Sequence, residues 1–372
     1  MRIDFIITEL SVGGAERCLT ELAIGMSRRG HGVRVISLAP PPAPPRDELA
    51  SRLEQAAVPL LSARSASSYL APLALMRVRK LLRDERPDLV QTFLFHANVL
   101  GTAAAAMAGV PVRVGGVRVA QRRPGRLWLE RRLVRKMQGL ICVSRSVADF
   151  AQQYLATSDT DIHVIPNAVD VPRFADARPL DWQTFDLPET ARVVLFVGRL
   201  DPQKGLERLF AAAQRFLAED PQAWLVLVGD GPLRSWCDQQ CRSMPGQRAR
   251  RLPWQADVAP LMRAARLFML CSRYEGMPNV VLEAMAAGRP VVCNEVEGVA
   301  ELLNHAPQQQ CVPQGDVPAL ATAANHWLAD EDEANRIGAA NQTYVRQHHT
   351  IEAMLDGYEQ LYAQWSRPTT AP

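Results

Sequence analysis

Two glutamates eight positions apart mark the part of the sequence with the clearest chemical potential. Glu275 and Glu283 lie in the segment EGMPNVVLEAMAAG, residues 275–288. Pro278 has the fixed φ that suits the first turn of a helix, so we expect a helix to begin there and to direct its positive end at an anionic ligand. Glu283 falls within the apolar part of that helix, where burial of a carboxylate without partners is costly. It is therefore hydrogen-bonded, or it binds a ligand, or it lies on the solvent side of an ordinary helix.

Two cations follow the strand that we predict at residues 193–197. Gly198 ends the strand, and Arg199 and Lys204 then stand five positions apart before a predicted helix at residues 205–217. A guanidinium offers a planar fork of donors and an ammonium offers a point charge, and together they suit a diphosphate. The alternative is a surface loop with two solvated cations.

Glycine-rich turns follow two other predicted strands. Gly13 and Gly14 come after the strand at residues 2–7, and Gly229 follows the strand at residues 224–228. Glycine permits positive φ and lets the backbone approach a ligand at a helix N-terminus closely. Each turn is equally compatible with a tight structural turn that binds nothing.

A histidine and a tryptophan also follow predicted strands, and each has two interpretations. His96 follows the strand at residues 89–92, where it faces a cleft or is an ordinary core or surface histidine. Trp254 precedes a predicted helix, where it lies beside a nucleobase or simply packs.

Short apolar strands alternate with helical patterns along the whole chain. This alternation is typical of βαβ units with parallel sheets that are buried on both faces. The change from one series of strands to the next falls within residues 170–188, where we expect the domain boundary. The predicted strands are residues 2–7, 33–38, 89–92, 112–117, 139–143 and 162–165, and then 193–197, 224–228, 267–270 and 291–293.

Length and composition indicate a soluble protein of two domains. The chain has 372 residues, of which 48% are hydrophobic and 22% charged, and no apolar run reaches the length that spans a membrane. The N-terminus lacks the basic and long apolar regions of a signal peptide, and seven cysteines without metal-ligand spacing suggest reduced thiols. We therefore expect a cytoplasmic protein.

The first half of the chain is basic and the second half is acidic. Residues 1–176 contain 24 basic and 16 acidic residues, whereas residues 177–372 contain 18 and 23. Ten basic residues and a single acid lie between residues 113 and 145. Nucleic acid is not the expected partner, because this segment lacks interleaved stacking aromatics and the second half is acidic.

The basic segment contains a predicted helix with two interpretations. Its residues Leu129, Leu133 and Met137 share one face. The helix either lies on an anionic membrane surface, or it buries that face in the domain and leaves its cations solvated. The cations that would contact a membrane or an acceptor are Arg126, Arg131, Arg132, Arg135 and Lys136.

Six segments, in this order, resemble the motifs of the retaining GT-B glycosyltransferases with the EX7E motif. They are GGAER, VSRSVADF, VIPNAVD, VGRLDPQKG, VGDGP and EGMPNVVLEAMAAGRPVV, and they cover residues 10 to about 320. The resemblance implies a GT-B fold, an α/β architecture of two Rossmann-like, doubly wound parallel-sheet domains that face a central cleft. It implies an acceptor-binding domain at residues 1–178, a nucleotide-sugar-binding domain at 179–350, and a helix at 351–366 that crosses back onto the first domain.

The resemblance also implies roles for individual residues. Glu283 matches the glutamate that binds the ribose hydroxyls, and Glu275 matches the one that contacts the donor sugar. Arg199 and Lys204 match the diphosphate pair, and His96 fits the cleft histidine. The other implied donor-binding residues are Gly13, Gly14, Gly198, Gly229, Trp254, Gly276, Met277, Pro278 and Asn279. The chain departs from the usual family pattern at Ala168, Pro253 and Cys271.

The function implied is retaining transfer of a sugar from a nucleoside diphosphate donor, with UDP favoured. The acceptor would be a lipid-linked or surface glycan, as in polysaccharide and lipopolysaccharide assembly, and transfer would proceed by front-face attack. We expect no metal and no cofactor, because the protein supplies the cations. The expected location is the cytoplasm, with peripheral contact to the inner membrane left open. The alternatives are a nucleotide-sugar epimerase of GT-B fold and a non-catalytic glycosyltransferase-like scaffold at the membrane.

Overall fold

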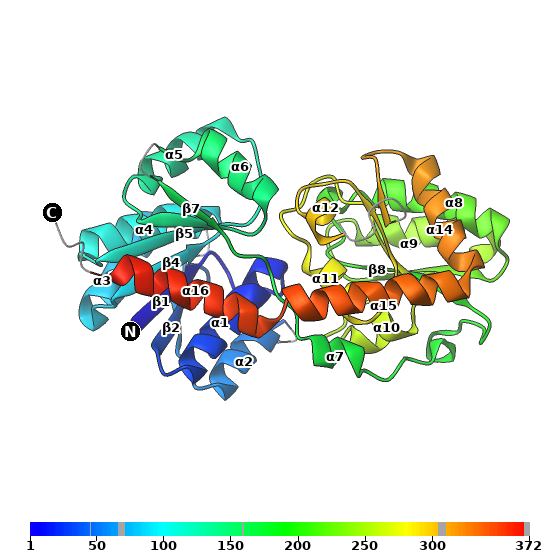
Figure 1. Ribbon diagram of the computed structural model, residues 1–372, viewed down its shortest axis with the longest axis horizontal. Coiled ribbons are helices and arrows are strands. Elements are labelled where there is room, and N and C mark those ends of the chain that lie inside the picture. The colour runs from blue at the N-terminus through cyan, green and yellow to red at the C-terminus, as the bar shows by residue number, and fades with distance from the viewer. Residues whose placement is uncertain (45, 66–70, 158–159, 304–309, 368–372) are drawn as a thin grey trace. The chain divides into compact units, whose positions relative to one another are not determined.

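The computed structural model describes residues 1–44, 46–65, 71–157, 160–303 and 310–367. The chain forms two compact units (Figure 1). Unit 1 contains residues 1–167 and 351–372, and unit 2 contains residues 168–350. The chain passes from unit 1 to unit 2 between residues 167 and 168. This is earlier than the predicted boundary between residues 178 and 179. The reason is α7 (Val171–Ala175), which packs against α10, α11 and α15 of unit 2 and buries Val171 and Phe174.

Unit 1 is built on a seven-stranded sheet in the order β3-β2-β1-β4-β5-β6-β7, and its strand pairs are parallel. Strand β3 was not predicted, because its three residues are too few to show a pattern. The strands are β1 (Arg2–Ile7), β2 (Gly32–Ser37), β3 (Leu60–Ser62), β4 (Leu89–Phe93), β5 (Val112–Val117), β6 (Gly139–Cys142) and β7 (Asp161–Val164).

The helices of unit 1 cover both faces of this sheet. From β1 the chain adds strands first toward the β3 edge of the sheet and then, from β4 on, toward the β7 edge. Because crossovers between parallel strands are right-handed, α1 and α2 lie on one face of the sheet and α3, α4 and α5 on the other. Helix α4 packs against both α3 and α5, so these three helices form a continuous layer. The helices are α1 (Gly14–Arg28), α2 (Glu48–Gln55), α3 (Ala71–Glu85), α4 (Phe95–Ala108), α5 (Pro124–Val134) and α6 (Arg145–Tyr154).

The last helix of the chain, α16 (Ile351–Ser366), belongs to unit 1 and packs against α1. Arg29 donates to Asp356 at 2.6 Å and to Glu359 at 2.7 Å, and Tyr362 donates to the buried Gln91 of β4 at 3.3 Å. Residues 271 to 330 positions apart in sequence thus hold α16 on α1 and on the sheet.

Unit 2 is built on a six-stranded sheet in the order β10-β9-β8-β11-β12-β13, again with parallel pairs. Strands β8, β9, β11 and β12 match the four predicted strands in position. The strands are β8 (Arg192–Val197), β9 (Ala223–Val228), β10 (Ala249–Leu252), β11 (Leu267–Leu270), β12 (Val291–Asn294) and β13 (Cys311–Val312).

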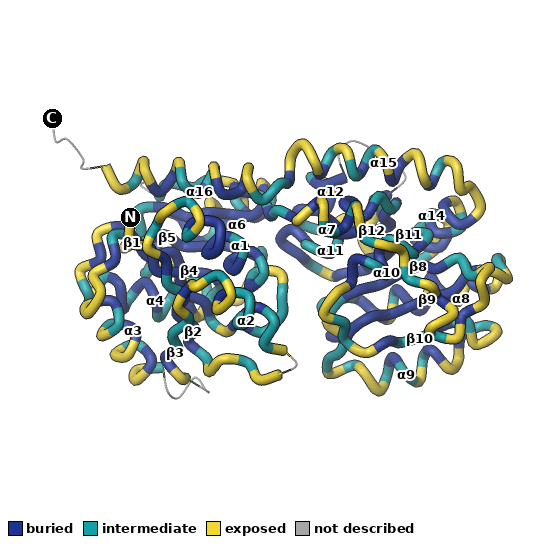
Figure 2. Tube along the Cα trace, turned by 90° about the horizontal axis from the view of Figure 1, so that it is seen from below, coloured by how far each residue is buried: buried dark blue, intermediate teal, exposed yellow. Residues whose placement is uncertain are grey.

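The helices of unit 2 follow its strands, as expected for a doubly wound domain. In both units the strands are mostly buried while the helices alternate between buried and exposed faces (Figure 2). The principal helices are α8 (Leu206–Glu219), α9 (Arg234–Ser243), α10 (Ala259–Ala264), α11 (Asn279–Ala286), α12 (Val299–Leu302), α14 (Val317–Ala329) and α15 (Glu331–His348). The predicted fold class, two parallel-sheet α/β domains, is confirmed.

Among the described residues, no helix combines the length and the hydropathy that crossing a bilayer requires.

Candidate active site

The turns after β8 and β9 pack directly against each other at the carboxyl edge of the unit 2 sheet. Gly198 donates to the carbonyl of Val228 at 3.0 Å. Gly229 has φ +151°, and a Cβ there would lie 2.0 Å from the carbonyl oxygen of Gly198. Gly231 has φ +157°, and a Cβ would lie 2.5 Å from the carbonyl oxygen of Leu200. Glycine is therefore required at Gly229 and Gly231 for the backbone to turn and to pack.

The two predicted cations follow this turn, and their environments differ. The side chain of Arg199 is 68% exposed and forms an ion pair with Asp201 at 2.6 Å. Asp201 also accepts from the backbone N–H of Gln203 and so caps the short 3-10 helix that ends at Lys204. The side chain of Lys204 is only 17% exposed. Arg199 is thus available to solvent, whereas Lys204 is held within the site.

Lys204 is held by Glu275. Its Nζ lies 2.7 Å from Oε1 of Glu275, which is 7% exposed and also accepts from the Ser272 hydroxyl at 2.6 Å. The backbone N–H of Glu275 donates to Glu297 at 3.4 Å. A buried carboxylate that has both an ammonium and a hydroxyl donor is satisfied and fixed in place.

Backbone packing brings these residues together. Gly205 has φ +60°, and a Cβ there would lie 2.1 Å from the carbonyl oxygen of Cys271. Gly298 has φ +73°, and a Cβ there would lie 2.0 Å from the carbonyl oxygen of Gly276. The turns that follow β8 and β12 are therefore in van der Waals contact with the Glu275 loop, which follows β11.

The Glu275 loop leads into α11, which begins at Asn279 after Pro278, as predicted. Pro278 has no side-chain acceptor, so it does not cap the helix. Gly276 and Met277 are buried with it. The first turn of α11 consequently brings backbone N–H groups and positive helix-end charge to the carboxyl edge of the sheet.

Glu283 lies in the second turn of α11 and is 8% exposed. This burial rules out the interpretation that it lies on the solvent side of the helix. It has an interaction partner within the chain. A partnered and buried carboxylate in an otherwise apolar helix is consistent with a side chain that is fixed in order to accept hydrogen bonds.

Trp254 follows β10, at the far edge of the same sheet. It is half-buried, and the preceding Pro253 is exposed. The order β10-β9-β8-β11 places β9 between the strand that precedes Trp254 and the strand that precedes Gly198. Both of its interpretations, stacking beside a base or simple packing, remain predictions.

Gly13 and Gly14 of unit 1 do not use the positive φ that glycine permits. Gly13 has φ −153°, and Gly14 is the first residue of α1. A Cβ on Gly13 would lie 2.3 Å from Oε2 of Glu16, the flexible end of that side chain. The Glu16 carboxylate therefore closely approaches the backbone at this helix N-terminus.

His96 lies in the first turn of α4, directly after β4, and is exposed. The residue before the helix, Leu94, has φ +73° and turns the chain sharply. The His96 ring centroid is 5.1 Å from that of Phe95, whose ring in turn carries the Arg126 guanidinium 4.7 Å from its centroid. Although the side chain is exposed overall, partial desolvation lowers the pKa of His96; the charge of Arg126 lowers it further, and the charge of Glu9 opposes the change. The lowered pKa favours the neutral imidazole.

The basic helix α5 is held on unit 1 by Val134, its one buried residue, which is 3% exposed. Leu129, Leu133 and Met137 are half-buried. Both interpretations of that face, a membrane surface or a domain helix, therefore remain predictions. The exposed cations are Arg131, Arg132, Arg135 and Lys136, whereas Arg126 is half-buried.

Several residues of interest were not found from the sequence. Ser272 and Glu297 contact Glu275, but they are a common serine and a common glutamate that no local pattern distinguishes. Trp128 is 60% exposed, with Arg132 4.4 Å from its ring centroid. Glu130 was noted only as the single acidic residue of the basic segment. Its isolation among cations was the sequence feature that could have identified it as a residue of interest. Within the described ranges, no three His, Cys, Asp or Glu side chains gather as a metal site would require.

Two family models match most of the chain. Residues 12–173 match the model described as Glycosyltransferase Family 4, and residues 179–344 match the model described as Glycosyl transferases group 1. The two matches correspond closely to the two units.

Individual proteins of known name are also similar. The chain is 32% identical over 241 residues to the UDP-Gal:alpha-D-GlcNAc-diphosphoundecaprenol alpha-1,3-galactosyltransferase of Escherichia coli. That match covers 60% of this chain and 62% of the relative, which is less than two thirds of the relative's length. The chain is also 26% identical to glycogen synthase of Mycobacterium tuberculosis, with 97% of this chain and 93% of the relative covered.

A solved structure shows the same fold over nearly the whole chain. The Anabaena protein HepE, in complex with UDP-glucose, superposes with a TM-score of 0.82 at 25% identity and covers 98% of this chain and 100% of that chain. The fold, the two family models and the relatives agree. The chain therefore belongs to the GT-B glycosyltransferase family.

Proposed function

We propose that this protein transfers a sugar, with retention of configuration, from a UDP-sugar to a lipid-linked or surface-glycan acceptor. The observation that carries the proposal is the cluster of Lys204, Glu275 and the start of α11 in unit 2. It places a cation, a fixed carboxylate and a helix N-terminus at one sheet edge. A nucleoside diphosphate sugar needs all three kinds of group.

The donor diphosphate interacts with Lys204 and Arg199. Lys204 is preorganised by Glu275, and Arg199 is exposed and free to move from Asp201 to a phosphate. Cleavage of the anomeric C–O bond places negative charge on the departing diphosphate. Fixed cations and helix-end N–H groups stabilise that charge, which is usually the largest single contribution to such catalysis. A protein that supplies these charges needs no divalent metal for this step.

The two glutamates bind hydroxyl groups of the donor. Glu283 accepts from the ribose, and Glu275 accepts from the transferred sugar, with the backbone N–H groups of Met277 and Asn279 beside it. Burial of both carboxylates supports these roles, because each accepts hydrogen bonds in a site with little competing water. Gly198 and Gly229 allow the backbone to approach the diphosphate.

Retention is proposed to occur by attack on the same face from which the diphosphate leaves. The leaving phosphate oxygen then takes the proton of the acceptor hydroxyl, so no separate protein base is needed. His96 contributes a hydrogen-bonding imidazole, and its lowered pKa favours the neutral form of the ring. A neutral ring does not repel the developing oxocarbenium ion.

The similar proteins support UDP and leave two acceptor classes to be compared. HepE binds UDP-glucose, and the Escherichia coli relative uses UDP-Gal and a diphosphoundecaprenol-linked sugar. The mycobacterial relative is a glycogen synthase, so its name points to a glucan. We favour the lipid-linked acceptor because the first half of the chain is basic.

The experiment has two stages. A thermal-shift screen across nucleoside diphosphates and UDP-sugars identifies the donor, and UDP compounds are expected to raise Tm most. The preferred UDP-sugar is then incubated alone, with a lipid-diphosphate-linked sugar, and with glycogen, each with and without EDTA. Product with the lipid-linked acceptor and the donor's anomeric configuration, formed in EDTA, supports the proposal. Conversion of the donor without acceptor would indicate an epimerase, and donor binding without any product would indicate a scaffold.

A further inference from the structure

Exposed apolar side chains concentrate on one layer of unit 1. Six large hydrophobic side chains are exposed among the described residues, and four of them lie on the α3–α4–α5 layer. They are Leu73 and Met76 of α3, Met107 of α4 and Trp128 of α5, which are 46%, 49%, 49% and 60% exposed. Isolated exposed apolar residues are ordinary, but a group on one layer indicates an interaction surface.

The middle helix of this layer is uncharged. Helix α4 has no Asp, Glu, Lys or Arg from Phe95 to Ala108. Val99, Ala103 and Ala106 are only half-buried, in addition to the exposed Met107, whereas the half-buried Leu100 packs against the core. An apolar strip therefore runs along α4 and is accessible to solvent.

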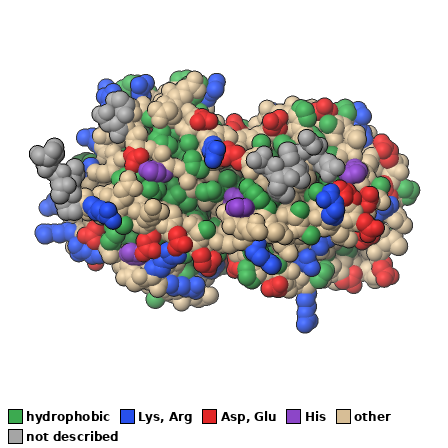
Figure 3. Space-filling model, viewed as in Figure 1, with side chains coloured by type: hydrophobic (Ala, Val, Ile, Leu, Met, Phe, Trp, Pro, Cys, Tyr) green, Lys and Arg blue, Asp and Glu red, His purple; other side chains and the backbone are tan. Residues whose placement is uncertain are grey.

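Cations border this strip on both neighbouring helices. On α3, Arg77, Lys80 and Arg83 are exposed, and on α5 the exposed cations begin with Arg131 and Arg132. The left and upper margins of unit 1 in Figure 3 carry many Lys and Arg side chains. Apolar side chains flanked by cations are complementary to a surface that is apolar inside and anionic outside.

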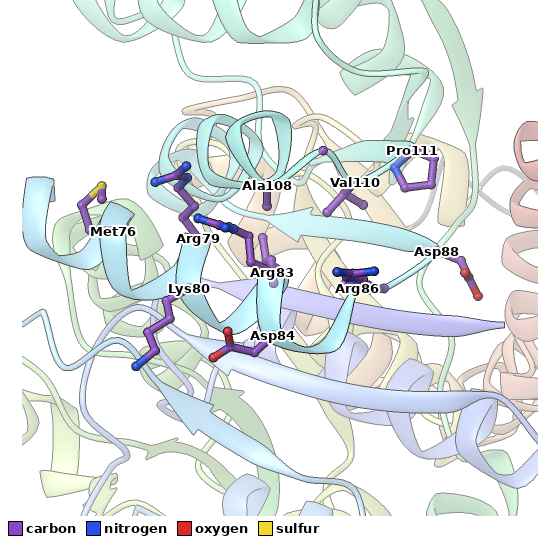
Figure 4. Close-up of a pocket in the computed structure, with 13 residues that line it drawn as sticks. Met76, Arg79, Lys80, Arg83, Asp84, Arg86, Asp88, Ala108, Val110 and Pro111 are labelled. Atoms are coloured by element: carbon purple, nitrogen blue, oxygen red, sulfur yellow. The ribbon is translucent and has the colours of Figure 1, made fainter.

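A pocket of about 860 Å³ at the end of this layer adds a place for an anionic group. Arg79, Lys80, Arg83 and Arg86 line it, and Arg79 and Arg83 point toward the end of α4 at Ala108 (Figure 4). Two carboxylates also line it, of which Asp88 already accepts from the backbone N–H of Arg2 at 2.7 Å. The pocket is therefore net positive and suits a phosphate headgroup.

We propose that the outer surface of α3, α4 and α5 docks unit 1 on an anionic lipid bilayer, with Met76, Met107 and Trp128 entering the interface. The pocket lined by Arg79 and Arg83 receives a lipid phosphate. This inference rests on the proposed function, because a lipid-linked acceptor requires the enzyme at a membrane. It extends the docking expected through α5, where Leu129 and Leu133 are half-buried, to the neighbouring helices α3 and α4.

The test is sedimentation of the full chain with phosphatidylcholine vesicles, with and without phosphatidylglycerol. Binding is expected only to the anionic vesicles and is expected to weaken with salt. Each Lys or Arg near the surface contributes about a fivefold increase in partitioning, so K80Q/R83Q is expected to lower it about 25-fold. The variant M76S/M107S is expected to weaken vesicle binding at every salt concentration, because it removes apolar contacts with the bilayer and no charge.

The matched control is R215Q/R242Q, which removes two exposed arginines of unit 2 and is expected to leave binding unchanged. A loss confined to the variant R131Q/R132Q/R135Q/K136Q, with K80Q/R83Q and M76S/M107S unaffected, would overturn the inference. So would a concentration-dependent dimer that M76S/M107S dissociates, since a second copy would then cover the surface. Every variant is also assayed for a UDP-induced rise in Tm. Retained donor binding without vesicle binding contradicts this inference alone, whereas vesicle binding without any donor binding contradicts the proposed function.

Discussion

The ammonium of Lys204 lies 2.7 Å from Oε1 of Glu275, although 71 positions separate the two residues. They meet because β8 and β11 are neighbouring parallel strands, whose carboxyl ends lie at the same edge of the sheet. The cation proposed for the diphosphate and the acid proposed for the sugar thus form one ion pair. A change at either residue alters the environment of the other.

Lys204→Gln is expected to reduce turnover by about 10²–10³-fold, because a charge that stabilises the leaving group is lost. It also leaves the buried Glu275 with Ser272 but without its ammonium partner, so Tm is expected to fall. Steady-state kinetics and thermal unfolding measure the two effects separately.

The double variant K204Q/E275Q distinguishes the two effects. It is expected to recover Tm, since no unpaired buried charge remains, but not turnover. Additive losses of Tm in the two single variants and the double variant would show that the residues do not act as a pair.

Glu283→Ala is expected to weaken UDP binding strongly, with little loss of helix α11, because alanine is the best helix former. Titration calorimetry with UDP measures the affinity, and circular dichroism checks the helix content. Glu189→Ala, at an exposed glutamate of the same unit, is the matched control. Unchanged affinity in Glu283→Ala would remove this residue from the donor site.

The order of strands and helices could be predicted largely from the sequence because its signals are local. Apolar runs such as residues 193–197 and the Pro278 helix start are visible within a few positions. The short strands β3, β10 and β13 were missed because none of them shows a long apolar run, and the early domain division was missed because it depends on contacts between distant segments. Helix α7 joins unit 2 only through packing against α10, α11 and α15.

The candidate site was predicted as separate groups, not as an arrangement. Lys204 and Glu275 were each identified, but their ion pair depends on which strands are neighbours, and the local pattern carries no such information. Ser272 and Glu297 had no distinguishing signal. The glycines at Gly13 and Gly229 look alike in sequence, yet only Gly229 has positive φ.

Gly298→Ala is expected to destabilise the protein and to weaken donor binding. Its φ of +73° is unfavourable for alanine, and its Cβ would lie 2.0 Å from the carbonyl oxygen of Gly276, in the Glu275 loop. Gly315→Ala is the matched control, because Gly315 has φ +86° but no atom within 4 Å of the added Cβ. The control is expected to lose about 1–2 kcal/mol of stability from φ alone. Thermal shifts with and without UDP compare the two, and equal effects would show that loop contact at Gly298 is unimportant.

Glu130 is expected to make unit 1 less stable as the pH rises. Burial raises its pKa to about 7 from an ordinary value of 4.5, against the opposing effects of a hydrogen bond to Asn98 and the charge of Arg126. The folded protein therefore binds more protons than the unfolded chain between these values. By linkage, the stabilisation is complete below about pH 4.5 and is lost as the pH rises through about 7.

Glu130→Gln is expected to remove this pH dependence, because an amide stays neutral at every pH. The variant is expected to be more stable than the natural protein above about pH 7, by at most about 3 kcal/mol given 1.36 kcal/mol for each pKa unit. Urea unfolding across this pH range measures the difference, with Glu54→Gln as a control at an exposed glutamate of the same unit. If Glu130→Gln and Glu54→Gln show the same pH profile, the Glu130 carboxyl titrates normally. The burial of this α5 side chain would then not hold a proton.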